Sequence, residues 1–379
     1  MRLRTRLFVA ALLTTVLVLS GSVVTGCPGE GTPDGTASGE APAAPATSGQ
    51  VPVDTTAQTP QQALFPVADD DGWGYIDRSG QMVIQPQFDG AWDFSEGLAQ
   101  VYPEEQGLGG YIDQTGEMAI ELRFYTTGYF SEGLAPVQPE PNGPWGYIDR
   151  AGQMVVEPRF YAAREFSEGL AQVQPEDYGP WGYIDRTGKL VIEPRSYAPY
   201  ADFSEGLALI QSSLEDPYGY IDQTGRMVIQ PQFVHARSFT EGLAAVALPQ
   251  AEGGYAYGYI DPDGEMVIPV QFYQAEGFRE GLAVVRPEED GPWGYIDHTG
   301  TMVIEPQFYD AWGFAEGGLA RVQPEEGGPW GYIDKTGQMI VAPQFYDARG
   351  FENGLALVQL EEDGRWGYID PTGKVVWPR

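Results

Sequence analysis

The chain has 379 residues, a formal net charge of −33 and a single cysteine. A surface with this excess of carboxylates repels phosphate backbones and anionic headgroups, which argues against nucleic acid as a partner. One cysteine cannot form an internal disulfide, so the folded part must be stabilised by packing alone.

The chain begins with the pattern of a secretion signal. Three arginines precede the apolar run Leu7–Leu19, which is short for a bilayer span of about 20 residues. The run ends in Val24-Thr25-Gly26-Cys27, which resembles the lipobox of bacterial lipoproteins. That resemblance implies a signal peptide at 1–26, a lipid on Cys27, and export to a bacterial membrane, facing the periplasm or the outer surface. An ordinary signal peptide or an uncleaved anchor is the alternative.

Residues 27–62 differ sharply in composition from the rest of the chain. Pro, Gly, Ala, Thr and Ser dominate, and Lys and Arg are absent. Such a segment has too little apolar area to offset the entropy of ordering, which predicts a disordered tether. Its 35 or so residues would span roughly 30–35 Å. Without the three signal-peptide arginines, 18 basic residues remain against 54 acidic ones, a balance of −36.

From residue 63 onward one sequence pattern occurs nine times. It reads Trp-Gly-Tyr-Ile-Asp-x-x-Gly-x-Met-Val-Ile, followed by Pro-x-Phe and Phe-Ser-Glu-Gly-Leu-Ala. The tyrosines of the Tyr-Ile-Asp core recur every 36 to 39 residues, at Tyr75, Tyr111, Tyr147, Tyr183, Tyr220, Tyr259, Tyr295, Tyr332 and Tyr368. Such a period is typical of repeat architectures, in which each unit buries its apolar face against its neighbours. We therefore predict one repeat domain, 63–379, with eight full units and a partial ninth.

Within one repeat the residues predict short strands joined by turns. In the unit 169–204, strands are expected at 170–174, 181–185 and 189–193, because aromatic and β-branched residues suit a pleated surface. Asp185-Arg186-Thr187-Gly188 predicts a tight turn, and Pro194 is expected to end the hairpin. No stretch has a sustained helical period. The fold is therefore predicted to be all-β, with tandem hairpin or meander repeats of about 36 residues.

The arrangement of these repeats is predicted less directly. Nine hairpin units exceed the 4–8 blades of common propellers. The chain also starts and finishes in nearly the same phase of the repeat, so no piece is left over to complete a split blade. Both features favour an open superhelical, solenoid-like array. A β-propeller-like ring is the alternative.

The segments Trp73-Gly74-Tyr75-Ile76-Asp77 and Phe94-Ser95-Glu96-Gly97-Leu98-Ala99, with their later copies, resemble the bacterial WG-repeat family. The resemblance covers nearly the whole chain after the tether and implies an all-β fold, but no activity. A weaker likeness to choline-binding and related cell-wall-binding repeats rests on the shared Trp-x-Tyr-x-Asp-x-x-Gly-x-Met hairpin.

Carboxylates that recur once per unit are the first candidates for chemistry. One aspartate per turn offers too few oxygens for Ca²⁺, which takes 6–8, and a glycosidase needs two carboxylates in different environments. We assign the aspartates to turn formation and the Ser-Glu-Gly glutamates to turns or solvated edges. The aspartates are Asp77, Asp113, Asp149, Asp185, Asp222, Asp261, Asp297, Asp334 and Asp370; the glutamates are Glu96, Glu132, Glu168, Glu205, Glu241, Glu280 and Glu316.

Other catalytic signals are missing from the sequence. The two histidines, His235 and His298, occupy different positions of different units, which suits variable surface sites. There is no phosphate-binding loop, nucleophile elbow or Cys/His cluster. We therefore expect no catalytic residue, no metal and no cofactor.

The remaining candidates are six tryptophans that recur once per unit. Strand alternation places Trp, Tyr and Asp of the motif on one face, so the indoles form either inter-repeat core or a ladder for stacking on sugars or peptides. They are Trp73, Trp145, Trp181, Trp293, Trp330 and Trp366. The sequence predicts a non-catalytic, surface-anchored binding or scaffolding module for protein partners in the cell envelope. The alternatives are a cell-wall or polysaccharide-binding protein that uses the aromatic ladder, and a hydrolase with an inter-repeat carboxylate site.

Overall fold

The computed structural model describes residues 62–104, 107–197, 202–251, 253–362 and 364–378. The chain divides into the units Met1–Ala57 and Gln58–Arg379, and every described residue belongs to the second. The signal peptide, Cys27 and nearly all of the tether lie outside the described residues, so the predictions made for them stay predictions. Within the described ranges the secondary structure is entirely β, as predicted, with 34 strands in nine antiparallel sheets. A search of the described part of the chain for helices able to cross a membrane found none.

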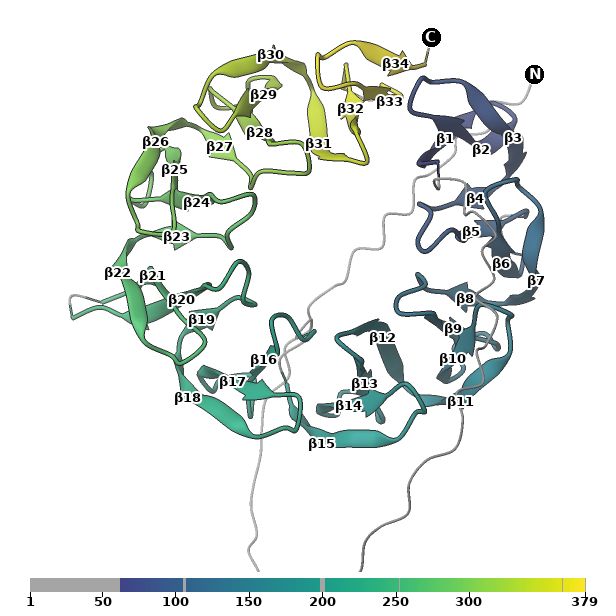
Figure 1. Cartoon of the computed structure of the whole chain (residues 1–379), viewed down its shortest axis with the longest axis horizontal. Coiled ribbons are helices and arrows are strands. Elements are labelled where there is room, and N and C mark those ends of the chain that lie inside the picture. Colours follow the sequence, from purple (N-terminus) through teal and green to yellow (C-terminus); the bar gives the residue numbers. More distant parts are fainter. Residues whose placement is uncertain (1–61, 105–106, 198–201, 252, 363, 379) are drawn as a thin grey trace, which may run out of the picture. The chain divides into compact units, whose positions relative to one another are not determined.

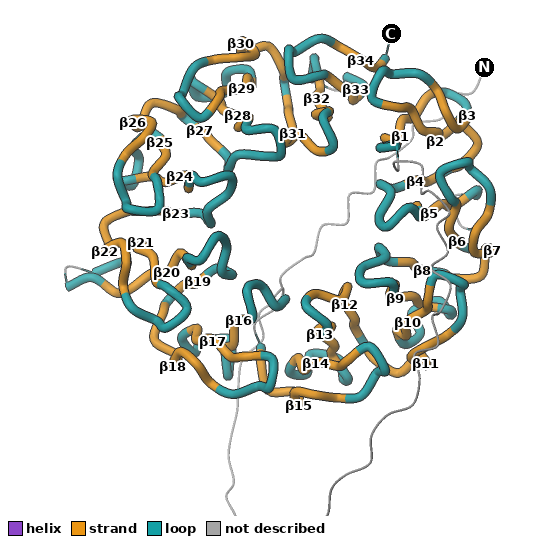
Figure 2. The backbone as a smooth tube through the Cα atoms, viewed as in Figure 1, coloured by secondary structure: helices purple, strands orange, loops and turns teal. Residues whose placement is uncertain are grey.

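The nine sheets lie side by side in a ring, which makes each sheet a blade of a β-propeller (Figure 1). The blades follow one another in chain order. Within a blade the strands are stacked from the centre of the ring to its rim, and the last strand is outermost (Figure 2).

The strands are distributed over the blades as follows. Blade 1 has β1 (Leu64–Asp69), β2 (Gly72–Asp77) and β3 (Met82–Phe88). Blade 2 has β4 (Gly90–Ala91), β5 (Ala99–Tyr102), β6 (Gly109–Ile112) and β7 (Met118–Phe124). Blade 3 has β8 (Thr126–Thr127), β9 (Leu134–Gln138), β10 (Trp145–Asp149) and β11 (Met154–Phe160). Blade 4 has β12 (Ala162–Ser167), β13 (Leu170–Gln174), β14 (Trp181–Asp185) and β15 (Leu190–Ser196). Blade 5 has β16 (Leu207–Ile210), β17 (Tyr218–Asp222) and β18 (Met227–Phe233).

Blade 6 has β19 (His235–Ala236), β20 (Ala244–Pro249), β21 (Tyr255–Ile260) and β22 (Met266–Phe272). Blade 7 has β23 (Gln274–Ala275), β24 (Ala283–Arg286), β25 (Trp293–Ile296) and β26 (Met302–Phe308). Blade 8 has β27 (Asp310–Ala311), β28 (Leu319–Gln323), β29 (Trp330–Asp334) and β30 (Met339–Phe345). Blade 9 has β31 (Asp347–Glu352), β32 (Leu355–Gln359), β33 (Trp366–Ile369) and β34 (Val375–Trp377).

Blade 4 shows why the repeat folds as it does. The hairpin turn between β14 and β15 is held by Asp185, whose Oδ1 accepts hydrogen bonds from Thr187 N at 2.9 Å, Thr187 Oγ1 at 2.6 Å and Lys189 N at 3.1 Å. The other eight motif aspartates accept equivalent backbone bonds. Their assignment to turn formation is confirmed.

The glycine of the Trp-Gly pair is required by a close approach of two strands. A Cβ on Gly182 would lie 2.6 Å from the carbonyl oxygen of Ile192 and 2.9 Å from Pro194 N. The register of β14 and β15 shifts on both sides of Tyr183, which is the irregularity that brings these atoms together. Pro194 does not end the strand, contrary to the prediction. β15 continues to Ser196, because a proline is tolerated on the outermost strand, where no further strand needs its missing N–H.

The cores lie between blades rather than within them. Tyr147 of blade 3 is buried among residues of blades 3 and 4, and its ring meets Phe166 edge-on at a centroid distance of 5.1 Å. Its hydroxyl donates to the carbonyl oxygen of Arg164 in blade 4 at 2.7 Å. The same bond to the next blade is made by Tyr75, Tyr111, Tyr220, Tyr259, Tyr295 and Tyr332, at 2.6–2.9 Å. Each tyrosine therefore joins two blades.

The contacts between neighbouring blades continue between the last blade and the first. Tyr368 of blade 9 donates to the carbonyl oxygen of Pro66 in blade 1 at 3.1 Å, and its ring lies 5.4 Å from that of Phe65. Arg365 forms an ion pair with Asp70 at 2.6 Å. Six buried residues from the two blades form one apolar cluster: Phe65, Val67, Ile76, Leu355, Tyr368 and Val376.

The predicted open array is therefore wrong, and the alternative, a β-propeller-like ring, is confirmed. Each sheet is built from consecutive strands, so the ring closes by side-chain packing and needs no blade split between the two ends of the chain. A propeller of this kind needs no extra strand at either end of the chain to complete a shared blade, so the lack of such a strand in the sequence is compatible with a closed ring. Nine blades exceed the common number of 4–8, yet the last blade meets the first through the same kinds of contact as the other neighbours.

Candidate functional site

The hairpins of every blade point to one of two faces of the ring. In blade 7, Trp293 pairs with Phe308 at one end of the strands and Ile296 pairs with Met302 at the other. We call the first end the loop face; it carries residues 287–292 and their equivalents, and the residue that follows each outer strand. We call the other end the turn face; it carries the Asp-x-x-Gly turns and the Ser-Glu-Gly loops.

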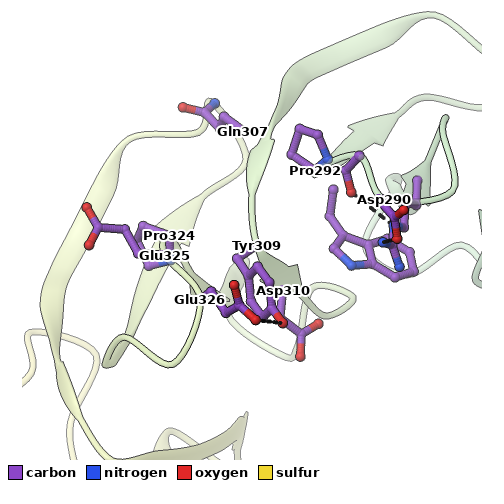
Figure 3. Close-up of a pocket in the computed structure, with 11 residues that line it drawn as sticks. Asp290, Pro292, Gln307, Tyr309, Asp310, Pro324, Glu325 and Glu326 are labelled. Carbon is purple, nitrogen blue, oxygen red and sulfur yellow. Dashed lines mark hydrogen bonds and ion pairs between the residues drawn. The ribbon is translucent and has the colours of Figure 1, made fainter.

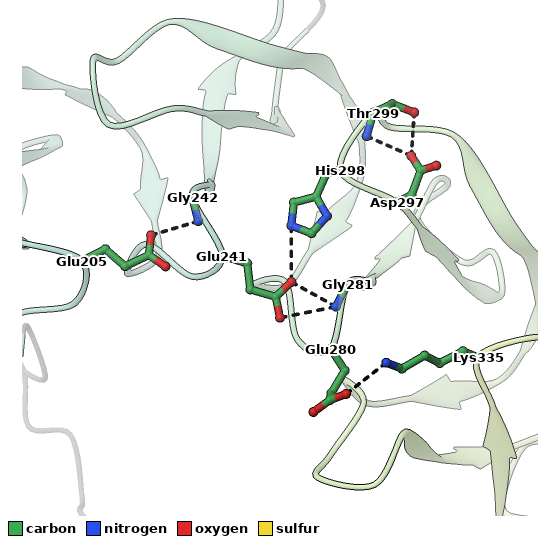
Figure 4. Close-up of polar contacts among 9 residues, drawn as sticks. All are labelled: Glu205, Glu241, Gly242, Glu280, Gly281, Asp297, His298, Thr299 and Lys335. Atoms are coloured by element: carbon green, nitrogen blue, oxygen red, sulfur yellow. Dashed lines mark hydrogen bonds and ion pairs between the residues drawn. The ribbon is translucent and has the colours of Figure 1, made fainter.

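On the turn face the repeated glutamates connect neighbouring blades (Figure 4). Glu205 of blade 5 accepts a hydrogen bond from Gly242 N of blade 6 at 2.9 Å, and Glu241 of blade 6 accepts one from Gly281 N of blade 7 at 3.0 Å. Three more glutamates bind the equivalent glycine N–H of the following blade: Glu96, Glu132 and Glu168. Glu316 binds Asn353 N, one residue before Gly354 of blade 9, at 2.9 Å. Glu280 instead pairs with Lys335 of blade 8 at 3.0 Å. This bonding supports a structural role for the glutamates.

The two histidines contribute to packing in the positions where they occur. His298 Nε2 lies 3.3 Å from Glu241 Oε2 (Figure 4), and the imidazole stacks on Phe278 with a centroid distance of 4.2 Å. His235 stacks on Tyr257 at 6.3 Å, and burial is the main cause that lowers its pKa below the usual 6.5. Among the described residues no cluster of histidine, cysteine and carboxylate side chains has a metal-binding arrangement.

The six tryptophans of the motif are each half-buried at the loop-face end of their blade. Trp73, Trp145, Trp293 and Trp330 pack against the apolar clusters between blades. Four indoles also carry an arginine of the chain over one ring face, at 5.5–5.8 Å. These pairs are Arg164–Trp181, Arg286–Trp293, Arg321–Trp330 and Arg349–Trp366. The structure thus places the indoles at the blade junctions and engages several of them internally, while their use in ligand stacking stays a prediction.

The loop face has a groove at the junction of blades 7 and 8 (Figure 3). Its volume is about 490 Å³. Blade 7 supplies Arg286, the loop 290–293 and Gln307, and blade 8 supplies Tyr309, Asp310 and the loop 324–326. We call this the 7/8 groove.

The same groove recurs one blade further on. A pocket of about 580 Å³ at the junction of blades 8 and 9 is lined by Gln323, Gly327, Gly328, Pro329, Gln344, Tyr346, Asp347 and Leu360. Gln344, Tyr346 and Asp347 hold the repeat positions that Gln307, Tyr309 and Asp310 hold in the 7/8 groove. The groove is therefore a product of the repeat itself.

Tyrosine–carboxylate pairs recur on the loop face. Tyr309 Oη donates to Glu326 Oε1 at 3.3 Å, and the negative charge of Glu326 is the first cause that raises the pKa of this tyrosine above its usual 10.0. Tyr273 and Glu289 form the same pair in blade 7, also at 3.3 Å. Asp310 has its pKa raised above 3.8, chiefly by burial.

The most exposed aromatic rings of the loop face include tyrosines that follow the outer strands, which were not among the residues predicted from the sequence. Tyr161, Tyr309 and Tyr346 are about half exposed, at 51%, 49% and 51%, which makes them more accessible than the motif tryptophans. A signal for them is present in the sequence, because Pro-x-Phe-Tyr occurs in these three units, at 158–161, 306–309 and 343–346. The Trp-Gly pair is the more regular signal in the sequence, but its indole is half-buried at the junction with the neighbouring blade.

Fold and surface together define a repeat β-propeller of nine blades. The chain belongs to the WG-repeat family: the model of the WG containing repeat matches residues 73–102, 110–138, 145–177, 181–212, 218–248, 257–287, 293–326 and 330–362. A comparison with curated proteins found no match.

Solved structures with a similar course of the chain are distant relatives at most. A streptogramin B lyase has 13% identity and a TM-score of 0.32, over 64% of this chain and 92% of its own. The selenomethionine-substituted virginiamycin B lyase from Staphylococcus aureus has 12% identity and a TM-score of 0.34, over 72% and 90%. Hsv2p of Kluyveromyces lactis has 7% identity and a TM-score of 0.39, over 65% and 96%. Similarity at this level carries no functional argument.

Proposed function

We propose that this protein is a non-catalytic binding module that presents its loop face to protein partners in the cell envelope. The observation that carries the proposal is the groove that recurs at two successive blade junctions, with volumes of about 490 and 580 Å³. Tyrosines with an apolar ring and a polar tip are favoured at protein interfaces. Repeated grooves also allow several weak contacts to one partner, and linked contacts can exceed single-site affinity by roughly 10²–10⁴.

The bonding of the repeated carboxylates supports the absence of catalysis. The motif aspartates hold their own turns, as Asp185 does through three bonds of 2.6–3.1 Å. Six of the seven turn-face glutamates bind a backbone N–H of the next blade, as Glu205 does at 2.9 Å, and Glu280 pairs with Lys335. A hydrolase would need two carboxylates free to act on one bond, and these groups are committed to the fold.

Export and anchoring are part of the same proposal. The lipobox-like Val24-Thr25-Gly26-Cys27 would place a lipid on Cys27, and the Pro- and Gly-rich tether would separate the ring from the membrane. Such an arrangement would hold the loop face within reach of other envelope proteins. It rests on the resemblance and the composition of the N-terminal residues.

A polysaccharide-binding module is the second candidate. The half-exposed rings of Tyr161, Tyr309 and Tyr346 recur around the loop face, and such rings can stack on sugars as well as on peptides. The carboxylates beside them favour a protein partner with basic residues over a neutral glycan.

Capture experiments separate the two candidates. The protein, purified in detergent and immobilised, is exposed to envelope protein extract and to purified envelope glycans. A double variant, Tyr309→Ala with Tyr346→Ala, removes two loop-face rings. The control, Val155→Ala with Val303→Ala, removes two exposed side chains from the outer strands β11 and β26.

We expect the wild type and the control to retain a specific set of proteins and the tyrosine variant to lose it. Retention of glycans that depends on the two tyrosines would support the second candidate instead. Turnover of a glycan or peptide, abolished by a single carboxylate substitution, would refute the non-catalytic proposal.

A further inference from the structure

We infer that the 7/8 groove receives a cationic side chain, arginine or lysine, from an extended basic segment of a partner protein. The inference rests on the proposed function and adds the surface used and the chemical class of the partner. It comes from three features of the groove: its carboxylates, the ring of Tyr309, and an arginine that the chain itself places beside the equivalent tyrosine of blade 7.

The groove has more negative than positive groups. Four carboxylates line it, Asp290, Asp310, Glu325 and Glu326, with one basic residue, Arg286. Arg286 approaches Asp290 at 4.0 Å. Among the described residues no lysine or arginine lies within ion-pair distance of Asp310, Glu325 or Glu326. The charges of Arg286 and Arg321 act on Asp310 and oppose the rise that burial causes in its pKa. Among the same described residues Glu325 and Glu326 have no such partner at ion-pair distance, and a neutral ligand would leave their two charges unpaired.

Tyr309 offers a fixed aromatic surface at the same place. Its ring is 49% exposed, and its hydroxyl is bonded to Glu326 at 3.3 Å, which restrains the ring against the loop 324–326. A cation near the ring face would interact with the ring and with Glu326 at once (Figure 3). Cation–π contacts of this kind contribute most when they are partly shielded from water.

Blade 7 contains the chain's own version of this contact. The Arg286 guanidinium lies 5.8 Å from the ring centre of Tyr273, the equivalent of Tyr309, and 5.8 Å from that of Trp293. Its Nε donates to the carbonyl oxygen of Gly291 at 2.9 Å. The surroundings of a loop-face tyrosine therefore accept a guanidinium without disturbing the blade.

In blade 8 the position of Arg286 is held by a neutral residue. Gln323 donates through Nε2 to the carbonyl oxygen of Gly328 at 2.6 Å, which reproduces the bond of Arg286 but brings no charge. Within the described part of the chain, no cation is placed over the Tyr309 ring. Arg286 occupies the space beside the Tyr273 ring. The equivalent space beside Tyr309 is thus available to a cationic side chain of a partner protein. The pocket at blades 8 and 9, with Tyr346 and Asp347, gives an extended segment a second place to bind.

The test uses octa-arginine as the probe and octa-citrulline as its uncharged counterpart of similar shape. Binding to the detergent-purified protein is measured by fluorescence anisotropy at about 0.15 M salt, where exposed charges more than about 8 Å apart are largely screened. The groove variant is Glu325→Gln with Glu326→Gln. The control, Glu157→Gln with Glu193→Gln, removes the same charge from exposed positions of the outer strands β11 and β15. Circular dichroism checks that both variants are folded.

We expect octa-arginine to bind, octa-citrulline to bind at least tenfold more weakly, and the groove variant to lose about tenfold in affinity, or about 1.4 kcal/mol. The control should stay within twofold of the wild type. Tyr309→Ala, which keeps every charge, should also weaken binding. Equal losses in the groove variant and the control would mean that only the overall charge matters and would overturn the inference, as would equal binding of the two peptides.

The same variants distinguish this inference from the proposed function. If the wild type and the variant Glu325→Gln with Glu326→Gln capture the same envelope proteins equally, the inference about the groove is refuted, whereas the proposed binding function is still supported. Groove-dependent binding of octa-arginine, together with no captured envelope protein, would leave the inference standing and remove support for the function.

Discussion

Closure of the ring predicts that the junction of blades 9 and 1 stabilises the protein as the internal junctions do. Leu355 of blade 9 is 3% exposed and packs in one cluster with Phe65 and Val67 of blade 1. Leu319 holds the same repeat position in blade 8, is 8% exposed, and packs in the cluster between blades 8 and 9. Leu355→Ala and Leu319→Ala therefore form a matched pair.

Truncating a buried leucine to alanine costs about 2–5 kcal/mol, depending on how far the site can collapse. Both substitutions should fall in this range. Leu355→Ala should lie nearer the lower end, since its cluster has six buried residues and that of Leu319 has nine. In an open array Leu355 would face solvent, and its truncation would change stability by less than about 0.5 kcal/mol.

Equilibrium urea unfolding, followed by tryptophan fluorescence and far-ultraviolet circular dichroism, measures both effects. The midpoints of the two variants should fall together relative to the wild type. An unchanged midpoint for Leu355→Ala beside a lowered one for Leu319→Ala would refute closure. Hydrogen exchange would then be fast in blade 1 and blade 9 even in the wild type.

Three further predictions concern the motif glycine, the turn aspartates and the N-terminus. Gly182→Ala should destabilise the protein, because the new Cβ would lie 2.6 Å from the Ile192 oxygen, whereas an unstrained Gly-to-Ala change stabilises a protein by roughly 0.4–1 kcal/mol; a thermal melt that matches the wild type would contradict this. Asp222 has a pKa below its usual 3.8, chiefly because Thr224 Oγ1 donates to it at 2.6 Å, so Thr224→Val should raise that pKa in a carboxyl NMR titration. A lowered folded-state pKa contributes stability that is present above pH 3.8 and is lost as the pH falls through the lowered value, and the variant should lose that contribution; an unmoved titration would show that the hydroxyl is not the cause. Cys27→Ala should abolish partitioning into detergent, and equal partitioning of variant and wild type would exclude a lipid on this cysteine.

The strands and turns within a blade were largely predictable, because the same pattern of strand and turn residues recurs in every repeat. The strands expected at 170–174 and 181–185 are β13 and β14 with the same bounds, and the Asp-x-x-Gly turn lies where the pattern places it. The extent of β15 beyond Pro194 was not predictable from the proline alone. It depends on the strand being outermost, which is a property of the assembled blade.

Closure was not predictable, because its contacts obey the same pattern as every other junction. The bond from Tyr368 to Pro66 joins residues 302 positions apart, yet the sequence around Tyr368 is that of any other unit. Whether the last blade meets the first depends on the angle between successive blades. That angle results from the packing of many side chains, so no single sequence motif indicates that the ring is closed.

Exposure was the least predictable feature of the candidate site. Alternation along a strand indicates one buried and one exposed face, but a blade is covered on both faces by its neighbours. Tyr183 and Ile184 are adjacent and are 1% and 0% exposed. The accessible rings lie instead just beyond the strand ends, as Tyr309 does after β26, where the alternation rule no longer applies.

Binding of a partner protein at the loop face is tested most directly by site-specific photocrosslinking in cells that produce the full chain. A photoreactive phenylalanine analogue is placed at Tyr309 in the 7/8 groove and, in a second strain, at Val303 on the outer strand β26. We expect a discrete protein adduct from position 309 that weakens when Glu325→Gln and Glu326→Gln are added, and no such adduct from position 303. The same adduct from both positions, or a protein adduct from position 303 alone, would contradict binding at the loop face.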